Sequence, residues 1–199
     1  MNTKNLTFAI MMGALGAALF AISYTIAPIA ASVAFDLSLI GVLIAGYYGG
    51  PKIGFLTGLI AGILPGIMFG PLGTGGALGL IALPLGKAFT GMTVGLLAGV
   101  LNIGKNKRLA ILAIPLTFLG FIPETLFTWG YFILVTRDVT FGTFLYSGIV
   151  VKALIEIGIM SLIMVALLRN TGFSCYVRNH FFNETKPTNS HTKTSPIAI

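Results

Sequence analysis

Charged residues are scarce in this sequence: Asp, Glu, Lys and Arg make up only 9% of its 199 residues. The mean hydropathy is +0.97, and 56% of the residues are hydrophobic. Soluble domains carry far more charge, about a quarter of their residues. The composition therefore excludes a soluble globular domain and predicts an integral membrane protein with one compact domain.

Cysteine and histidine are nearly absent. Cys175 is the single cysteine, and the two histidines, His180 and His191, lie near the C-terminus. One cysteine forms no intramolecular disulfide and no cysteine-based metal cluster. Apolar segments without histidine or cysteine offer no zinc or haem ligands and no nucleophile–base pair. We therefore expect a protein that is not an enzyme and binds no metal.

Acidic residues are also few, with five Asp and Glu against twelve Lys and Arg. Most of the basic residues fall in short segments between apolar runs and in the C-terminal tail, which is the pattern of cytoplasmic loops. We therefore attribute the net charge of +7 to orientation in a membrane, not to nucleic-acid binding.

The chain contains six apolar segments. We expect an all-α integral membrane protein, a six-transmembrane-helix bundle with helices at about 5–23, 37–49, 52–66, 80–101, 109–135 and 142–168. The second and third segments are short for a full span, and a tight turn at Gly50-Pro51 joins them. Asp36 is well placed to cap the start of the second helix. A polar, disordered tail is expected over 170–199.

Six spans put both termini on the same side of the membrane. The other side carries Arg137, which Asp138 balances. The positive-inside rule therefore places both termini in the cytoplasm. A cleaved signal peptide in place of the first helix would spoil this alternation, and the first apolar run is long for one. The basic residues on the side of the termini are Lys4, Lys52, Lys105, Lys107, Arg108, Arg169 and Arg178.

Four ionisable residues lie inside apolar segments: Lys87, Glu124, Lys152 and Glu156. A charge at membrane depth is costly and normally faces a protein interior or a watery cavity. Lys152 and Glu156 are four residues apart and share a helix face. These residues could form internal ion pairs that only hold helices together. We favour a polar pocket open to the outside, because intramembrane ionisable residues mark binding sites and pathways.

Two neighbours of Glu124 extend the candidate site. Thr128 lies one helical turn further on, and Trp129 is the single tryptophan of the chain. Trp129 could stack on a ring-bearing ligand or belong to the aromatic belt of the membrane interface. We expect a small polar ligand with a carboxylate or amine. The candidate substrate-binding residues are Lys87, Glu124, Thr128, Trp129, Lys152 and Glu156.

The first segment carries a repeated spacing of small residues. Ala14 and Ala18 are four residues apart, as are Ala17 and Ala21. Small residues at this spacing let another helix approach closely. By spacing alone, an internal packing seam is the simpler interpretation.

The stretch FDLSLIGVLIAGYYGGPKIGFLTGLIAGI, residues 35–63, resembles the S components of energy-coupling factor (ECF) transporters. These are small membrane proteins of bacteria and archaea that capture vitamins. The resemblance lies in the entry Asp36-Leu37-Ser38, the Gly50-Pro51 turn and the G-x-x-x-G spacing of Gly54 and Gly58. The alanines of the first segment are similar to the family's AxxxA pattern.

The resemblance implies a substrate-capture subunit in the prokaryotic cytoplasmic membrane, spanning it several times. Such a subunit binds a vitamin-like molecule from the extracellular side and delivers it by associating with a T component and two ABC-type ATPases. ATP is hydrolysed by these partners, so no cofactor is expected in this chain. The resemblance also implies that Ala14, Ala17, Ala18 and Ala21 form the docking face for the T component. It names no substrate, because S components differ in their pocket residues.

Two other functions fit apolar helices with buried charges. A stand-alone, proton-coupled secondary transporter would use Glu124 or Glu156 as its proton carrier. Residues 1–101 and 109–168 show no convincing similarity of the kind that inverted repeats leave, which weakens this alternative. A structural membrane subunit, with ion pairs that are purely internal, would bind no specific ligand.

Overall fold

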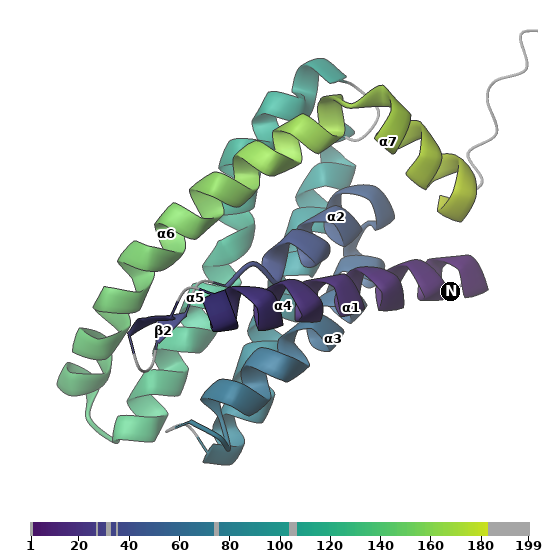
Figure 1. Ribbon diagram of the computed structural model, residues 1–199. Coiled ribbons are helices and arrows are strands. Elements are labelled where there is room, and N and C mark those ends of the chain that lie inside the picture. Colours follow the sequence, from purple (N-terminus) through teal and green to yellow (C-terminus); the bar gives the residue numbers. More distant parts are fainter. Residues whose placement is uncertain are drawn as a thin grey trace, which may run out of the picture.

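The computed structural model describes residues 2–26, 28–30, 33–34, 36–73, 76–103 and 107–182, and this part of the chain is mostly helical (Figure 1). Two short strands, β1 (Pro28–Ala30) and β2 (Val33–Ala34), pair antiparallel between the first two helices. The long helices are α1 (Thr3–Ile26), α2 (Leu39–Gly49), α3 (Pro51–Phe69), α4 (Gly76–Val100), α5 (Ala113–Thr136) and α6 (Val139–Arg169). Shorter helical elements are η2 (Lys107–Leu112), α7 (Thr171–Val177) and η3 (Arg178–Phe182).

Five helical stretches are long and apolar enough to cross a membrane: α1, α3, α4, the run Arg108–Thr136 that includes α5, and α6. Helix α2 is also apolar, but its 11 residues are fewer than the roughly 20 that a bilayer core requires. Most of its residues are buried among the other helices. The fold is therefore that of a helical, multi-pass membrane protein with one short internal helix.

Aromatic contacts bring helix ends together at two opposite ends of the bundle (Figure 1). At one end, the ring of Phe8 in α1 lies 4.8 Å from that of Phe181 in η3. At the other end, the ring of Phe20 in α1 lies 5.8 Å from that of Phe69 in α3. Tyr131 of α5 also reaches this second end, donating its hydroxyl hydrogen to the Phe69 carbonyl oxygen at 3.3 Å. Helix α1 therefore runs from the end that holds η3 to the end that holds the β1–β2 hairpin.

Helices α3 and α4 approach each other so closely that their backbones touch. A Cβ atom at Gly58 of α3 would collide with the backbone of Lys87 and Ala88 in α4. Gly54 meets Gly91 of α4 in the same way. Close packing through glycine is a common way to join helices in a membrane, where apolar burial gives little drive for association. This contact fixes the backbone of Lys87 against α3.

The segment after α6 is not the disordered tail that the sequence analysis predicts for 170–199. Asn170 caps α7, accepting a hydrogen bond on Oδ1 from the Phe173 N–H at 3.1 Å. Further on, the rings of Phe181 and Phe182 pack on Phe8 at 4.8 and 5.3 Å. The prediction was wrong for 171–182, because these aromatic side chains find an apolar surface on α1 despite the polar composition around them. Residues 183–199 lie outside the described residues.

Candidate functional site

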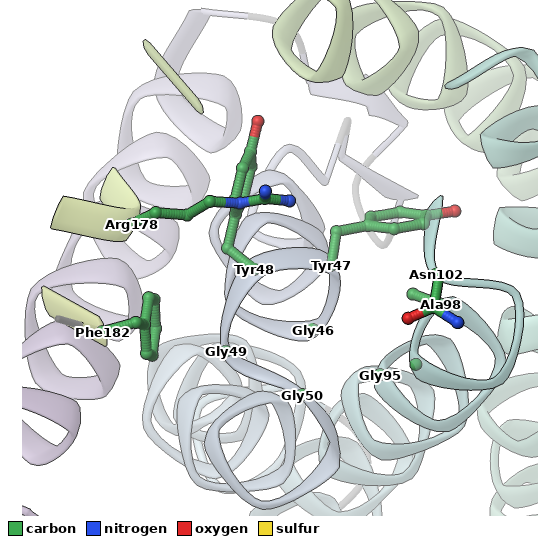
Figure 2. Close-up of a pocket in the computed structure, with 11 residues that line it drawn as sticks. Gly46, Tyr47, Tyr48, Gly49, Gly50, Gly95, Ala98, Asn102, Arg178 and Phe182 are labelled. Atoms are coloured by element: carbon green, nitrogen blue, oxygen red, sulfur yellow. The ribbon is translucent and has the colours of Figure 1, made fainter. Parts of the chain in front are cut away.

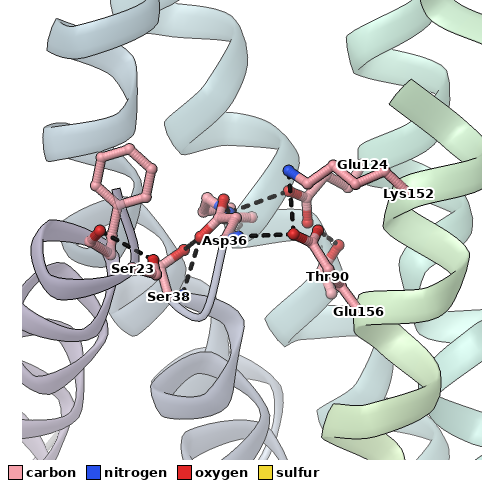
Figure 3. A network of polar contacts seen from close by, with 9 residues as sticks. Ser23, Asp36, Ser38, Thr90, Glu124, Lys152 and Glu156 are labelled. Atoms are coloured by element: carbon pink, nitrogen blue, oxygen red, sulfur yellow. Dashed lines mark hydrogen bonds and ion pairs between the residues drawn. The ribbon is translucent and has the colours of Figure 1, made fainter. Parts of the chain in front are cut away.

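A network of charged side chains joins α4, α5, α6 and the residues that lead into α2 (Figure 3). Its central residue is Lys87, from the middle of α4. The Lys87 Nζ atom lies 2.7 Å from Asp36 Oδ2 and 3.3 Å from Glu124 Oε1. The Lys87 side chain is 1% exposed. One buried ammonium group is thus shared between two carboxylates from different parts of the chain.

Both carboxylate oxygens of Glu124 in α5 have partners. Its Oε1 atom contacts Lys87, and its Oε2 atom accepts a hydrogen bond from Thr90 Oγ1 at 3.1 Å. Gly86 of α4 leaves room for it, since a Cβ atom there would lie 3.2 Å from Glu124 Cγ. Lys87 and Thr90 are three residues apart on α4 and share one face of the helix. That face therefore binds the carboxylate with one cationic and one neutral donor.

Asp36 is the one network member that does not come from a candidate membrane-spanning helix. Its Oδ1 atom accepts hydrogen bonds from the N–H and the hydroxyl of Ser38, and its Oδ2 atom accepts one from Lys87 Nζ. Burial alone would raise the pKa of the Asp36 carboxyl, but the neighbouring Lys87 ammonium holds this pKa below its ordinary value. The structure places Ser38, not Asp36, at the cap position of α2. The predicted cap is thus wrong: the Asp36 carboxylate instead links the start of α2 to α4.

Helix α6 joins the network through Glu156. The Glu156 Oε1 atom lies 3.0 Å from Lys152 Nζ and accepts a hydrogen bond from the Asp36 backbone N–H at 2.8 Å. Lys152 and Glu156 pair along one face of α6, as their spacing predicts. The segment that carries Asp36 is therefore attached twice: by its side chain to α4 and by its backbone to α6.

The structure brings four of the predicted binding residues into this network: Lys87, Glu124, Lys152 and Glu156. Thr128 is half-buried and makes no hydrogen bond within the described part of the chain. Trp129 is 39% exposed, and its Nε1–H donates to Thr143 Oγ1 of α6 at 3.1 Å. These two predicted residues therefore lie outside the network.

Sequence reasoning missed two members, Asp36 and Thr90. Asp36 lies at the edge of an apolar segment, where a helix cap explains a carboxylate without any buried partner. Thr90 is a small polar residue that apolar helices tolerate at many positions. The spacing could have identified Thr90, because it follows Lys87 by three residues and so lies on the same helix face.

The alanines of α1 face away from the rest of the chain. Ala14, Ala18 and Ala21 are exposed, and Ala17 is half-buried. The inward face of α1 is instead formed by Phe8, Ala9, Gly13, Gly16, Phe20 and Ser23. The internal-seam interpretation of Ala14 and Ala18 is therefore wrong, and these residues are open to lipid or to another protein.

A cleft of about 220 Å³ opens elsewhere, where α2 and α4 end (Figure 2). Its lining includes Gly50, Asn102 and Arg178, and Figure 2 shows Arg178 lying across Tyr48. The C-terminal ends of two helices carry partial negative charge, which a guanidinium group complements. The hydroxyl of Tyr48 is engaged with Leu167 O at 3.2 Å and with Ser174. Arg178 thus has a structural explanation here, and the charged network remains the better candidate site.

In comparisons with protein-family models, with curated proteins and with solved structures, nothing matches this chain. Among the described residues, no group of three or more His, Cys, Asp or Glu side chains is arranged to hold a metal ion. The network itself is tightly bonded: within the described ranges, every buried side-chain nitrogen and oxygen has a hydrogen-bond partner. Its chemistry is that of paired charges, which can hold helices together or exchange partners with a polar ligand.

Proposed function

We propose that this chain is the S component of an ECF-type importer, which captures a small vitamin-like molecule on the extracellular side of a prokaryotic cytoplasmic membrane. The observation that carries the proposal is the buried contact between Lys87 and Asp36. It joins a cation on a spanning helix to the segment between α1 and α2 at 2.7 Å. That segment belongs to the part of the sequence, residues 35–63, that resembles S components.

The proposed topology has six spans, with α2 and the residues around it as the sixth, and with both termini in the cytoplasm. Helix η3 packs on the start of α1, so both described ends of the chain lie at one end of the bundle. On that side lie Lys52 at the start of α3, Arg169 at the end of α6 and Arg178 at the start of η3, in agreement with the positive-inside rule. The β1–β2 hairpin at the opposite end would then face the outside.

In the proposed mechanism the ligand enters from the hairpin side and exchanges partners with the network. The Asp36 segment has to move for this, which breaks its contacts with Lys87 and Glu156. Polar groups of the ligand then pair with the charged groups of Lys87, Glu124 and Glu156. Pairing with the ligand offsets the cost of separating buried charges. Without a ligand this cost is not offset, so opening of the empty site is unfavourable. Delivery into the cell follows from association with a T component and two ATPases, which supply the ATP hydrolysis.

A stand-alone, proton-coupled transporter is the second candidate. Glu124 and Glu156 are both buried, at 7% and 5% exposure, and both contact a lysine that could stabilise the carboxylate after a proton leaves. This function needs no partner subunit and no ATP.

A ligand screen with the purified chain tests the proposal. The detergent-solubilised chain alone is heated with vitamins, vitamin precursors and amino acids, and the midpoint of thermal unfolding is recorded. A ligand at a hundredfold excess over its dissociation constant stabilises the fold by about 2.7 kcal/mol, which shifts the midpoint measurably. We expect one clear ligand, bound without any partner protein. If no compound binds, the structural-subunit interpretation replaces this one.

Uptake of that ligand then separates the two transport mechanisms. We expect uptake only when a T component and its ATPases are produced with the chain, and no immediate effect of a protonophore while ATP is maintained. Uptake by the chain alone that collapses with the proton gradient would instead establish the secondary transporter.

A further inference from the structure

The charged network holds unequal numbers of opposite charges. Three carboxylates, on Asp36, Glu124 and Glu156, contact two ammonium groups, on Lys87 and Lys152. Ser38 and Thr90 add neutral donors to the carboxylates of Asp36 and Glu124. With all groups ionised, the network has a formal excess of one negative charge. A net charge in a low-dielectric interior is costly until a cation neutralises it.

One carboxylate oxygen in the network also lacks a partner. Both oxygens of Asp36 and both oxygens of Glu124 accept contacts. On Glu156, the ion pair with Lys152 and the hydrogen bond from Asp36 both fall on Oε1. The Oε2 atom therefore accepts nothing from the described residues, although Glu156 is only 5% exposed. Every fully buried side-chain oxygen among the described residues has a hydrogen-bond partner, so Oε2 keeps a small accessible surface. A charged oxygen with an accessible surface and an open acceptor position can bind a donor.

We infer that the captured molecule carries one positive charge on an N–H group, such as a protonated amine, and that Glu156 Oε2 is its anchor. This inference rests on the proposed function and adds the charge class of the ligand to it. An ammonium group donates to Glu156 and cancels the excess negative charge of the network in the same step. An anionic ligand would raise that excess to two and would have to displace Asp36 or Glu124 from Lys87. The same geometry therefore selects against anions.

The test uses three classes of probe with the purified, detergent-solubilised chain at neutral pH, measured by isothermal titration calorimetry. The cationic class contains pyridoxamine, tyramine and histamine, each with one protonated amine; the neutral class contains riboflavin and pyridoxine; the anionic class contains biotin, pantothenate and nicotinate. Pyridoxamine and pyridoxine share a ring and differ at one amine, so this pair isolates the charge. We expect binding only in the cationic class.

The variant Glu156→Gln is expected to weaken binding of the cationic probe roughly tenfold or more, because a buried charge partner is lost. Asp138→Asn is the matched control, since it also removes one negative charge from the chain. Asp138 caps α6 at an exposed position, where asparagine caps equally well, and its variant is expected to bind like the native chain.

The outcomes separate the inference from the proposed function. A neutral or anionic compound that binds, or a cation whose affinity Glu156→Gln leaves unchanged, overturns the inference and leaves the S-component proposal standing. No binding in any class counts against the proposed function and against the inference with it. Because the charge selectivity is measured on the native chain, the inference remains testable even if Glu156→Gln does not fold.

Discussion

Lys87 balances two carboxylates that would otherwise face each other. Its Nζ atom is 2.7 Å from Asp36 and 3.3 Å from Glu124, and its side chain is 1% exposed. Lys152, in contrast, pairs with the single carboxylate of Glu156 and is 17% exposed. Removal of Lys87 leaves the carboxylates of Asp36 and Glu124 without their ammonium group, whereas removal of Lys152 affects the carboxylate of Glu156. The two lysines therefore differ in what their removal leaves behind.

We expect Lys87→Met to destabilise the chain strongly, by about 3–5 kcal/mol, because two buried carboxylates lose their counter-ion. Lys152→Met is the matched comparison: it removes the same charge with the same substitution, and its loss is expected to be clearly smaller. The measurement is the midpoint of thermal unfolding of each purified variant in the same detergent. Equal losses for the two variants would contradict the central position given to Lys87.

Much of the network could be predicted from the sequence, because charged residues are rare in its apolar segments. Charges inside apolar segments are few, so Lys87, Glu124, Lys152 and Glu156 stand out without any structure. Which charges meet depends on how helices pack, and sequence spacing gives only contacts within one helix. Lys152 with Glu156 is such a contact, whereas Asp36 with Lys87 joins residues 51 positions apart. The first was predictable and the second was not.

At the scale of elements, the contact between α3 and α4 determines where the network can form. Gly58 of α3 lies directly against the backbone of Lys87. Alanine is intrinsically a better helix former than glycine, by about 1 kcal/mol. At Gly58 this gain is opposed by a collision between main chains, which no change of side-chain rotamer can relieve. Glycine is therefore needed at this position for space and not for flexibility.

The variant Gly58→Ala is expected to lower the unfolding midpoint, because α3 and α4 must separate to admit one methyl group, at a cost of about 1–3 kcal/mol. Gly148→Ala in α6 is the matched control, since a Cβ atom there meets nothing within 4 Å. Its midpoint is expected to stay unchanged or to rise. Thermal unfolding of both variants in one detergent decides the point, and a Gly58→Ala variant as stable as the native chain would refute the close approach.

The ends of the helices were predicted less well from the sequence than their positions. The expected third helix, 52–66, ends just after Pro65, yet α3 continues to Phe69 because Pro65 is accommodated inside the helix. The expected fifth helix starts at 109, whereas residues 107–112 form the 3-10 turn η2 and α5 starts at Ala113. Apolar composition locates a membrane helix well, but its ends depend on capping and on neighbours in space. The G-x-x-x-G spacing of α3 did identify residues of a close packing face, although not the helix that it meets.

For the whole molecule, the outward face of α1 is the surface that the rest of the chain leaves uncovered. Ala14 and Ala18 are exposed there, while Gly13 and Gly16, their near neighbours in sequence, are buried against α2 and α3. One helix thus carries two small-residue faces, and only the inner one is used within the chain. The sequence alone could not assign the two faces, because small residues three apart and four apart are both neighbours on a helix surface. In the proposed importer, the outer face is the one that a T component would contact.

Replacing Ala14 and Ala18 together with leucine tests this assignment. The new side chains point away from the bundle, so the unfolding midpoint and ligand binding are expected to stay as in the native chain. A T component that approaches through the alanines would no longer fit, because leucine holds the two helix backbones apart. We therefore expect the double variant to lose co-purification with the T component and its ATPases, and to lose uptake. Ala166→Leu, at an exposed alanine of α6, is the control and should assemble normally. An intact complex with the double variant would place the docking face elsewhere, whereas loss of folding would mean that α1 packs through its alanines within the chain after all.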